Sequence, residues 1–311
     1  MHDTTIAPDR RGFLKCMSWA GSAMLWTVAG GVPRSRLITD ARAATQDASG
    51  GFTFAQVSDS HIGFDKPVNT DVTATFREAL GQAATVPEKP AFLIHTGDLT
   101  HLSKPAEFDT VAQLMGGTGL QAYTVPGEHD LLEDDRKSYL NRYGKGTKGD
   151  GWYSFDAGGV HFIGLVNVVN LQGGGLGNLG ADQLEWLEDD VAHLGASTPI
   201  VVFAHIPLWM VAEDWGWGTA DAAQALGYLK RFGSVTVLNG HIHQVMQKVE
   251  GQVAFHTARS TAFPQGTPGQ AKGPGPMAVP PGALKTYLGT TKVTLIRNDT
   301  HLAVVDRTLS G

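Results

Sequence analysis

Short apolar runs alternate with amphipathic segments through most of the chain between residues 50 and 250. The runs are rich in β-branched and aromatic residues, and polar residues follow each of them, which is typical of strands. The predicted strands are Phe52–Ser58, Ala91–His95, Gln121–Val125, Val160–Val166, Pro199–Ala204, Val235–Leu238 and Val253–His256.

Segments with the apolar spacing of helices lie between several of these runs. They are Val72–Ala84, Pro105–Met115, Ala181–Leu194 and Ala222–Phe232. Because strands and helices alternate along the chain, we expect an α/β fold with layers packed on both faces of the sheet.

Two hairpins and one long loop complete the pattern. Trp152–Phe155 pairs with Val160–Val166 across two consecutive glycines, and Lys292–Arg297 pairs with His301–Asp306 across an Asn-Asp turn. The stretch Pro264–Pro281 is rich in proline and glycine, which predicts an exposed loop. No internal repeat is visible, so we expect a single domain after the N-terminal segment.

The N-terminal segment has the pattern of an export signal. Arg10-Arg11-Gly12-Phe13-Leu14-Lys15 precedes an apolar stretch, Cys16–Pro33, and Ala41-Arg42-Ala43 supplies a cleavage pattern. This resembles a twin-arginine signal, which implies the twin-arginine export machinery as a partner and a periplasmic or secreted protein. The predicted division is a signal peptide over 1–43 and a domain over 44–311. The alternative is a retained anchor, but the apolar stretch is short and weakly hydrophobic, so no stable membrane anchor is expected.

Composition and charge narrow the function further. Hydrophobic residues make up 42% of the chain, so it can bury a core, and its single cysteine, Cys16, lies in the segment predicted to be removed. A disulfide framework and a thiolate metal site are therefore excluded from the mature chain. Cleavage after Ala43 removes six Lys/Arg and three Asp/Glu, which changes the net charge from −6 to −9. This acidic balance argues against nucleic acid as a partner and favours small phosphate esters.

Polar residues able to bind metals follow five of the predicted strands, and ligands bind at the carboxyl ends of strands in open α/β sheets. In chain order the ligand candidates are Asp59, His61, Asp98, Glu128, His205, His241 and His243, and His129 directly follows Glu128 as a candidate catalytic residue. A mixed set of imidazoles and carboxylates suits Fe, Mn or Zn. Seven ligand candidates exceed what one ion needs, which suggests two divalent or trivalent ions about 3.5–4 Å apart that clamp a phosphoryl group. Glycine precedes Asp98, Glu128 and His241, and we expect it to let the chain turn sharply there.

These motifs, in this order, resemble those of the calcineurin-like metallophosphoesterases over about residues 52–245. The resemblance implies a four-layer αββα sandwich with two metals at the top of the sheets. It implies that Asp59, His61 and His243 bind one ion, that His205 and His241 bind the other, and that Asp98 bridges both. His129 would stand near the leaving group as a general acid or donor. Gly97-Asp98-Leu99-Thr100 looks like the motif of members that act on cyclic nucleotides and other phosphodiesters.

The sequence departs from the family at residue 128, where Glu128 replaces the usual Asn. Glu brings a negative charge and one more methylene, whereas Asn offers a neutral carbonyl oxygen. As a ligand, Glu128 would neutralise part of the metal charge, so metal preference, pH optimum or substrate would change.

Other residues are candidates for contacts around the centre. His101 and Trp209 are the substrate-binding candidates. Trp209 shares a loop with Trp215 and Trp217, and these tryptophans would either stack on an aromatic ring of the substrate or form an apolar plug beside the site. Asp130 is expected to orient His129 or cap a loop.

Three functions fit the sequence. The first is an exported hydrolase of phosphate monoesters or diesters, in which hydroxide held by two metals attacks phosphorus. The second is a metal-loaded binding or assembly protein on the same scaffold. The third is a hydrolase or lyase that acts on a substrate without phosphate.

Overall fold

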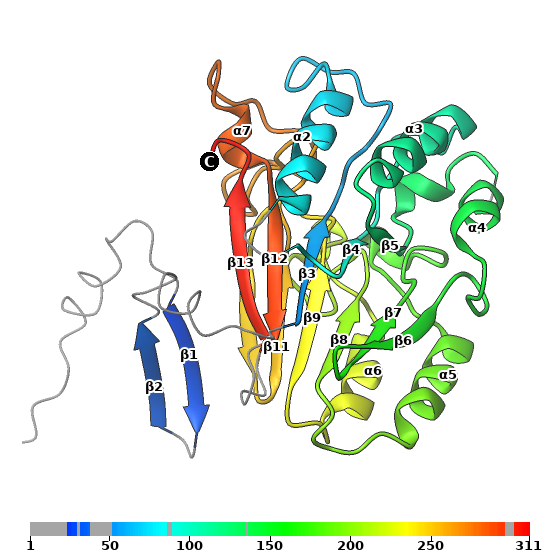
Figure 1. Cartoon of the computed structure of the whole chain (residues 1–311), viewed down its shortest axis with the longest axis vertical. Coiled ribbons are helices and arrows are strands. Elements are labelled where there is room, and N and C mark those ends of the chain that lie inside the picture. Colours follow the sequence, from blue (N-terminus) through cyan, green and yellow to red (C-terminus); the bar gives the residue numbers. More distant parts are fainter. Residues whose placement is uncertain (1–23, 30–31, 38–51, 86–88, 135, 296–301) are drawn as a thin grey trace, which may run out of the picture. The chain divides into compact units, whose positions relative to one another are not determined.

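The computed structural model describes residues 24–29, 32–37, 52–85, 89–134, 136–295 and 302–311 (Figure 1). The chain divides into two units, 1–49 and 50–311. The described part of the first is a hairpin in which β1 (Met24–Ala29) pairs antiparallel with β2 (Val32–Leu37). The twin-arginine motif and the cleavage pattern at 41–43 lie outside the described residues, so the signal peptide stays a prediction.

The second unit contains two sheets, each with both parallel and antiparallel neighbours. The five-stranded sheet has the order β13 (Leu302–Thr308), β12 (Gly289–Leu295), β3 (Phe52–Val57), β4 (Phe92–His95) and β5 (Gln121–Thr124). The six-stranded sheet has the order β10 (Gln247–Glu250), β11 (Val253–Thr257), β9 (Val235–Asn239), β8 (Ile200–Phe203), β7 (Val160–Gly164) and β6 (Tyr153–Ala157).

The register of the parallel strands brings their carboxyl ends level. Val57 of β3 lies opposite His95 of β4, and His95 lies opposite Thr124 of β5. In the other sheet, Phe203 of β8 lies opposite Leu238 of β9. The residues that follow these strands therefore emerge along the same edge of each sheet.

Helices cover the outer face of each sheet (Figure 1). The helices α2 (Val72–Ala84), α3 (Pro105–Gly116) and α4 (Lys137–Tyr143) belong to the layer over the five-stranded sheet, whereas α5 (Ala181–Ala192) and α6 (Ala222–Leu229) cover the six-stranded sheet. A short helix, α7 (Leu284–Tyr287), and three 3₁₀ turns, η1 (Glu128–Leu131), η2 (Gly173–Gly175) and η3 (Glu213–Trp215), lie in the connections.

Each central strand contributes to two apolar layers, one between the sheets and one under the helices, because successive residues of a strand point to opposite faces. Phe54 of β3 packs between the sheets, where its ring meets that of Phe162 of β7 at 5.2 Å and 82°. Its neighbours Ala55 and Val57 pack instead against the helices. The order helix, sheet, sheet, helix confirms the predicted four-layer αββα fold.

The structure contains an edge strand, β10, that the sequence does not predict. All four of its residues, Gln247–Glu250, are exposed, so the sequence shows no alternation of apolar and polar residues there. The predicted loop Pro264–Pro281 contains no helix or strand, but its first residues are buried, so it is only partly exposed.

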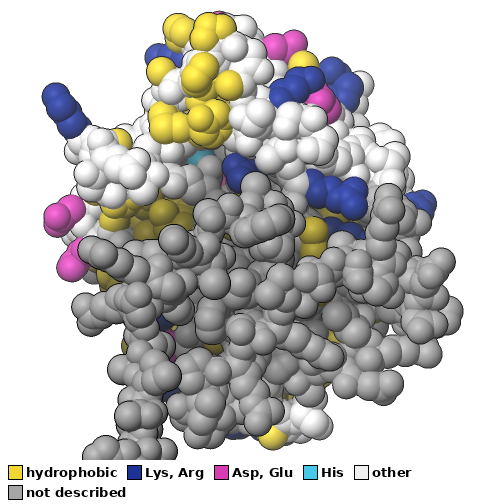
Figure 2. All heavy atoms as spheres, turned by 90° about the vertical axis from the view of Figure 1, so that its left-hand side faces the viewer, with side chains coloured by type: hydrophobic (Ala, Val, Ile, Leu, Met, Phe, Trp, Pro, Cys, Tyr) yellow, Lys and Arg dark blue, Asp and Glu magenta, His cyan; other side chains and the backbone are white. Residues whose placement is uncertain are grey.

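No helix of the described residues is both long and apolar enough to cross a bilayer. The described side chains on the face in Figure 2 include charges of both signs among polar and apolar ones.

His161 of β7 is a buried histidine near the amino end of its strand, away from the carboxyl ends where the other polar residues gather. Its Nδ1 lies 2.9 Å from Asp156 Oδ1, and its Nε2 lies 2.9 Å from Asp190 Oδ2. Burial lowers the pKa of His161, but the hydrogen bonds to Asp190 and Asp156 outweigh it and raise the pKa above 6.5.

Protonated His161 should therefore stabilise the fold. A raised folded-state pKa gives stability that is fully present below the unfolded pKa, about 6.5, and is lost as pH rises through the folded value. The wild type is expected to exceed His161→Gln in free energy of unfolding by on the order of 1 kcal/mol at about pH 5.5, since Asp156 is solvent-exposed and screened. Urea denaturation across pH should show this difference shrinking by about pH 9; a constant difference would contradict the ion pair's role.

Candidate metal centre

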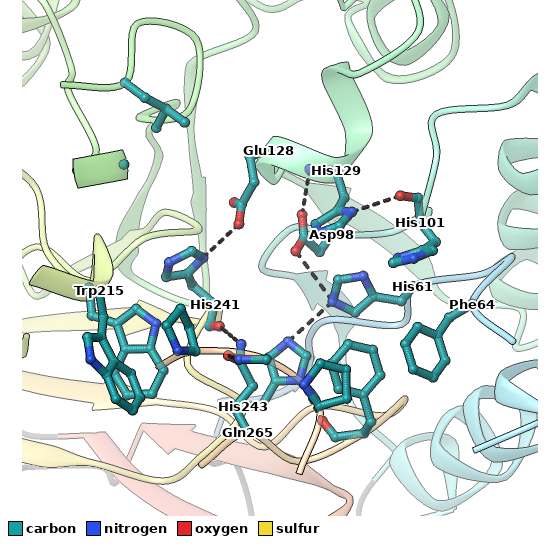
Figure 3. A pocket seen from close by; sticks show the side chains of 17 residues that line it. His61, Phe64, Asp98, His101, Glu128, His129, Trp215, His241, His243 and Gln265 are labelled. Carbon is teal, nitrogen blue, oxygen red and sulfur yellow. Dashed lines mark hydrogen bonds and ion pairs between the residues drawn. The ribbon is translucent and has the colours of Figure 1, made fainter. Parts of the chain in front are cut away.

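Loops at the carboxyl ends of strands from both sheets deliver the polar side chains to one place (Figure 3). The five-stranded sheet contributes residues that follow β3, β4 and β5, and the six-stranded sheet contributes residues that follow β8 and β9. The structure brings together all seven predicted metal ligands and His129: Asp59, His61, Asp98, Glu128, His129, His205, His241 and His243.

One group of donors consists of Asp59, His61 and His243, and all three are buried. The Nε2 atoms of His61 and His243 lie 3.2 Å apart, and His243 Nε2 lies 3.3 Å from Asp59 Oδ1. One carboxylate and two imidazoles thus present their donor atoms to a common point.

A second group has the same composition. Glu128 Oε2 lies 3.0 Å from His205 Nε2, and Glu128 Oε1 lies 3.1 Å from His241 Nδ1. The two imidazole nitrogens are 3.2 Å apart. Each carboxylate oxygen of Glu128 therefore faces a different histidine of the group.

Asp98 joins the two groups. Its Oδ2 lies 3.4 Å from His61 Nε2 and 3.4 Å from His205 Nε2, so it faces one histidine of each group. Its other oxygen, Oδ1, accepts a hydrogen bond of 3.0 Å from the backbone N–H of His129. A carboxylate in this position is placed to bridge two ions.

The backbone at these residues is strained. Among the described non-glycine residues, Asp59, His61, Asp98, His241 and His243 all have positive φ, between 41° and 70°. The left-handed conformation is unfavourable for L-residues and persists where the surroundings enforce it, often at functional sites. The hydrogen bonds from Asp59 N to Gly97 O, 3.0 Å, and from His61 N to Asp98 O, 2.9 Å, help to hold it here.

Backbone carbonyls fix the orientation of three imidazoles. Nδ1 of His205 donates to Thr96 O at 2.8 Å, and Nδ1 of His243 donates to Phe263 O at 2.5 Å. A carbonyl only accepts, so the proton lies on Nδ1 and a neutral ring keeps its Nε2 lone pair for the centre. His129 donates in the same way to His101 O at 2.7 Å.

The negative charges of the carboxylates in the centre favour a cation between them. Burial raises the pKa of Glu128, but His241 and His205 outweigh it and hold the pKa well below its usual value. Burial likewise raises the pKa of Asp59, yet His243 brings it down to about 2. Burial lowers the pKa of His205, but Asp98 and Glu128 raise it well above 6.5. The carboxylates thus favour positive charge between them, which metal cations supply.

Asp130 ties two of the loops together. It is buried, and its carboxylate accepts hydrogen bonds from the backbone N–H groups of Leu99, Thr100 and Gly127 at 3.1, 2.8 and 2.9 Å. Burial and the charge of Asp98 raise the pKa of Asp130 to about 7. The residue holds loops in place, as the sequence suggested, although its hydrogen bonds come from these backbone groups and from the Thr100 hydroxyl rather than from the His129 ring.

A model of the calcineurin-like phosphoesterase family matches residues 52–245, the span that carries every one of these side chains. This chain belongs to that family. Membership assigns it to the metal-dependent phosphoesterases.

Individual relatives share low sequence identity with this chain. A 3′,5′-cyclic-nucleotide phosphodiesterase of Nostoc sp. is 23% identical over 68% of this chain and 79% of its own length. A cAMP/cGMP dual specificity phosphodiesterase of Mycobacterium tuberculosis is 26% identical over 69% of each chain. Purple acid phosphatase 15 of Arabidopsis thaliana is 28% identical over 38% of this chain, and the match spans only 24% of that protein.

A solved structure agrees in fold. The dimetal phosphatase from Danio rerio aligns with a TM-score of 0.62 at 15% identity, over 83% of this chain and 96% of that one. At this identity the likeness concerns the fold alone.

A cavity of about 360 Å³ opens beside the phosphoesterase centre. His101 lines it and stacks on His129 at 4.9 Å and 17°, so the predicted contact residue lies at the cavity. Trp209 does not line it and instead packs against Phe255 at 5.1 Å. Two other tryptophans of this loop, Trp215 and Trp217, line the cavity in its place.

The carbonyl partners of the histidines carried no signal in the sequence, because every residue has a carbonyl. Gln265, whose Nε2 donates to His241 O at 2.8 Å, also carried no signal in the sequence (Figure 3). The proline- and glycine-rich composition that follows it was visible, but it indicated only a loop.

The glycines before the ligands act mainly through their small size. Gly97 has φ +95° and turns the chain as expected, but Gly127 and Gly240 do not have positive φ. A Cβ at Gly127 would overlap the Asp98 carboxylate, and one at Gly240 would overlap Ser58 and the Asp59 carboxylate. Two of the three sites therefore need glycine for close packing rather than for a turn.

Gly127→Ala should displace Asp98 and weaken metal binding. We expect metal affinity to fall by roughly 10- to 100-fold, as when a ligand loses its support. The control is Gly81→Ala in α2, where a Cβ meets nothing within 4 Å. Titration of the metal-free chain with Mn²⁺ should separate the two variants, and equal affinities would show that Asp98 adjusts freely.

Proposed function

We propose that this chain hydrolyses phosphate esters with two metal ions. The observation that carries the proposal is the pair of donor groups of identical composition, joined by Asp98. One ion would be held by Asp59, His61 and His243, and the other by Glu128, His205 and His241. The fit rests on imidazole lone pairs and carboxylates that converge where the charge of a cation is required.

Two divalent ions at such a centre supply Lewis acidity, which polarises the phosphoryl group and acidifies a water molecule. The chain's own residues fix the geometry. Asp98 faces both groups of donors, and its hydrogen bond from His129 N keeps the histidine loop against the centre. The protein therefore holds the reacting groups in place before substrate arrives.

His129 is placed to assist the leaving group. Its Nδ1 is taken by His101 O, so Nε2 is the nitrogen that remains for a substrate, and His129 lines the cavity. In the proposed reaction the oxygen of water bonds to phosphorus, one proton of that water passes to solvent, and the bond from phosphorus to the ester oxygen breaks. The released alkoxide takes the Nε2 proton of His129 in its doubly protonated form, and His129 regains a proton from solvent.

Hydrolysis of bis(p-nitrophenyl) phosphate by Mn²⁺-loaded protein tests the proposal. His61→Ala is expected to lower the rate by roughly 10³-fold or more, because one ion loses a ligand. The matched control is His193→Ala, since His193 is exposed and lies outside the cavity. Its rate and metal content should equal those of the wild type.

Metal content of each variant decides between the outcomes. A wild type that binds two ions per chain and hydrolyses no phosphate ester would overturn the proposed activity. It would support the metal-loaded binding protein instead.

A further inference from the structure

The cavity beside the centre has one polar side and one apolar side. The donors of the centre and His129 form the polar side. The apolar side comes from chain segments that are not part of the centre: Phe64, Trp215, Trp217, Phe263, Pro274 and Pro276. Ligand pockets with this division orient a polar group and pack an apolar one.

Trp215 is a half-buried, firmly held part of this wall. Its ring meets the ring of Trp217 edge-on at 4.9 Å and 78°, and Trp217 is fully buried. The loop 211–217, which carries both rings, is closed by hydrogen bonds from Trp217 N to Ala212 O, 3.0 Å, and from Val211 N to Trp217 O, 2.7 Å. A rigid indole offers a large contact area at a low entropy cost to a flat ring.

The proline-rich part of the wall is fastened to the centre itself. Gln265 Oε1 accepts a hydrogen bond from Gly275 N at 2.8 Å, and Gln265 Nε2 donates to His241 O at 2.8 Å. Gln244 adds hydrogen bonds of 3.0 and 2.9 Å to the carbonyls of Gln265 and Gly266. Pro274 and Pro276 therefore keep a fixed position relative to the donors.

Positive charge is scarce around the cavity. No lysine or arginine is among the described residues that line it. Lys66 is near enough to His101 to contribute to lowering its pKa, after burial and His129, but it is not part of the lining. A bound anion must therefore be balanced by the centre.

Glu128 sets how much charge the centre can balance. Two divalent cations against the three carboxylates of Asp59, Asp98 and Glu128 leave one positive charge. With the family's Asn in place of Glu128, two would remain. One positive charge matches a phosphodiester monoanion, whereas a phosphomonoester dianion would leave an uncompensated negative charge in a partly buried cavity.

We propose that this cavity selects phosphodiesters with a planar aromatic arm packed against Trp215 and the two prolines, and that Glu128 sets the preference for diesters over monoesters. This inference rests on the proposed function for its metal-loaded centre. Hydrolysis of such a diester gives a dianionic monoester, which the centre binds poorly and releases. A separate phosphomonoesterase reaction must then consume that product.

Binding of phosphate esters to Mn²⁺-loaded protein, with product formation followed in the same sample, tests the role of Trp215 separately from turnover. By calorimetry, the wild type should bind diphenyl phosphate at least about 10-fold more tightly than dimethyl phosphate, the ringless diester. Trp215→Ala should lose most of that difference, Trp215→Phe should keep it, and Trp186→Leu, outside the cavity, should not alter it. Tighter binding of thymidine 5′-phenyl phosphate than of diphenyl phosphate would identify the ring as a nucleobase, and the reverse order as a simple aryl group. Equal binding of diphenyl and dimethyl phosphate by the wild type would overturn the aromatic arm.

The same assay with phenyl phosphate tests Glu128. The wild type should prefer diphenyl phosphate to phenyl phosphate by at least about 10-fold, and Glu128→Asn should move the ratio of the two dissociation constants about 10-fold or more towards the monoester. Metal content, measured alongside, must show two ions in each sample. An unchanged ratio in a fully loaded Glu128→Asn sample would overturn the role of Glu128. A wild type that shows these preferences without hydrolysing any ester would instead count against the proposed function alone.

Discussion

The carboxylate of Asp98 is the interaction on which the rest of the centre depends. It lies between His61, which follows a strand of one sheet, and His205, which follows a strand of the other, at 3.4 Å from each. Its second oxygen holds the backbone of His129. Two independent sheets therefore meet at one anionic group, and the four-layer fold serves to bring their edges within reach of it.

The fold was predictable because it follows from local patterns. The helix Val72–Ala84 has the bounds that the apolar spacing predicted, and the parallel strands begin or end within two residues of their expected positions. The convergence of residues that follow these strands could be expected from the rule that parallel strands end at a common edge. The strand β10 was missed because its residues are all exposed and so lack an apolar face.

The details of the centre depended on contacts between distant segments. Gly127 and Gly240 look like turn residues in the sequence, but the structure shows that the Asp98 and Asp59 carboxylates fill the space a side chain would take. Trp209 and Trp215 are the same residue type in the same loop, so the sequence does not distinguish them. Only the path of the loop decides which of them reaches the cavity. The export signal, by contrast, rests on the sequence motif alone.

The hydrogen bonds of Gln265 join two regions that are often treated as separable: Gly275 belongs to the wall of the cavity, and the His241 carbonyl belongs to the centre. A change in the length of the proline-rich loop would be transmitted to a proposed ligand. New specificities are therefore more accessible by exchanging single side chains on this wall than by grafting loops, unless the graft carries its own counterpart of this glutamine.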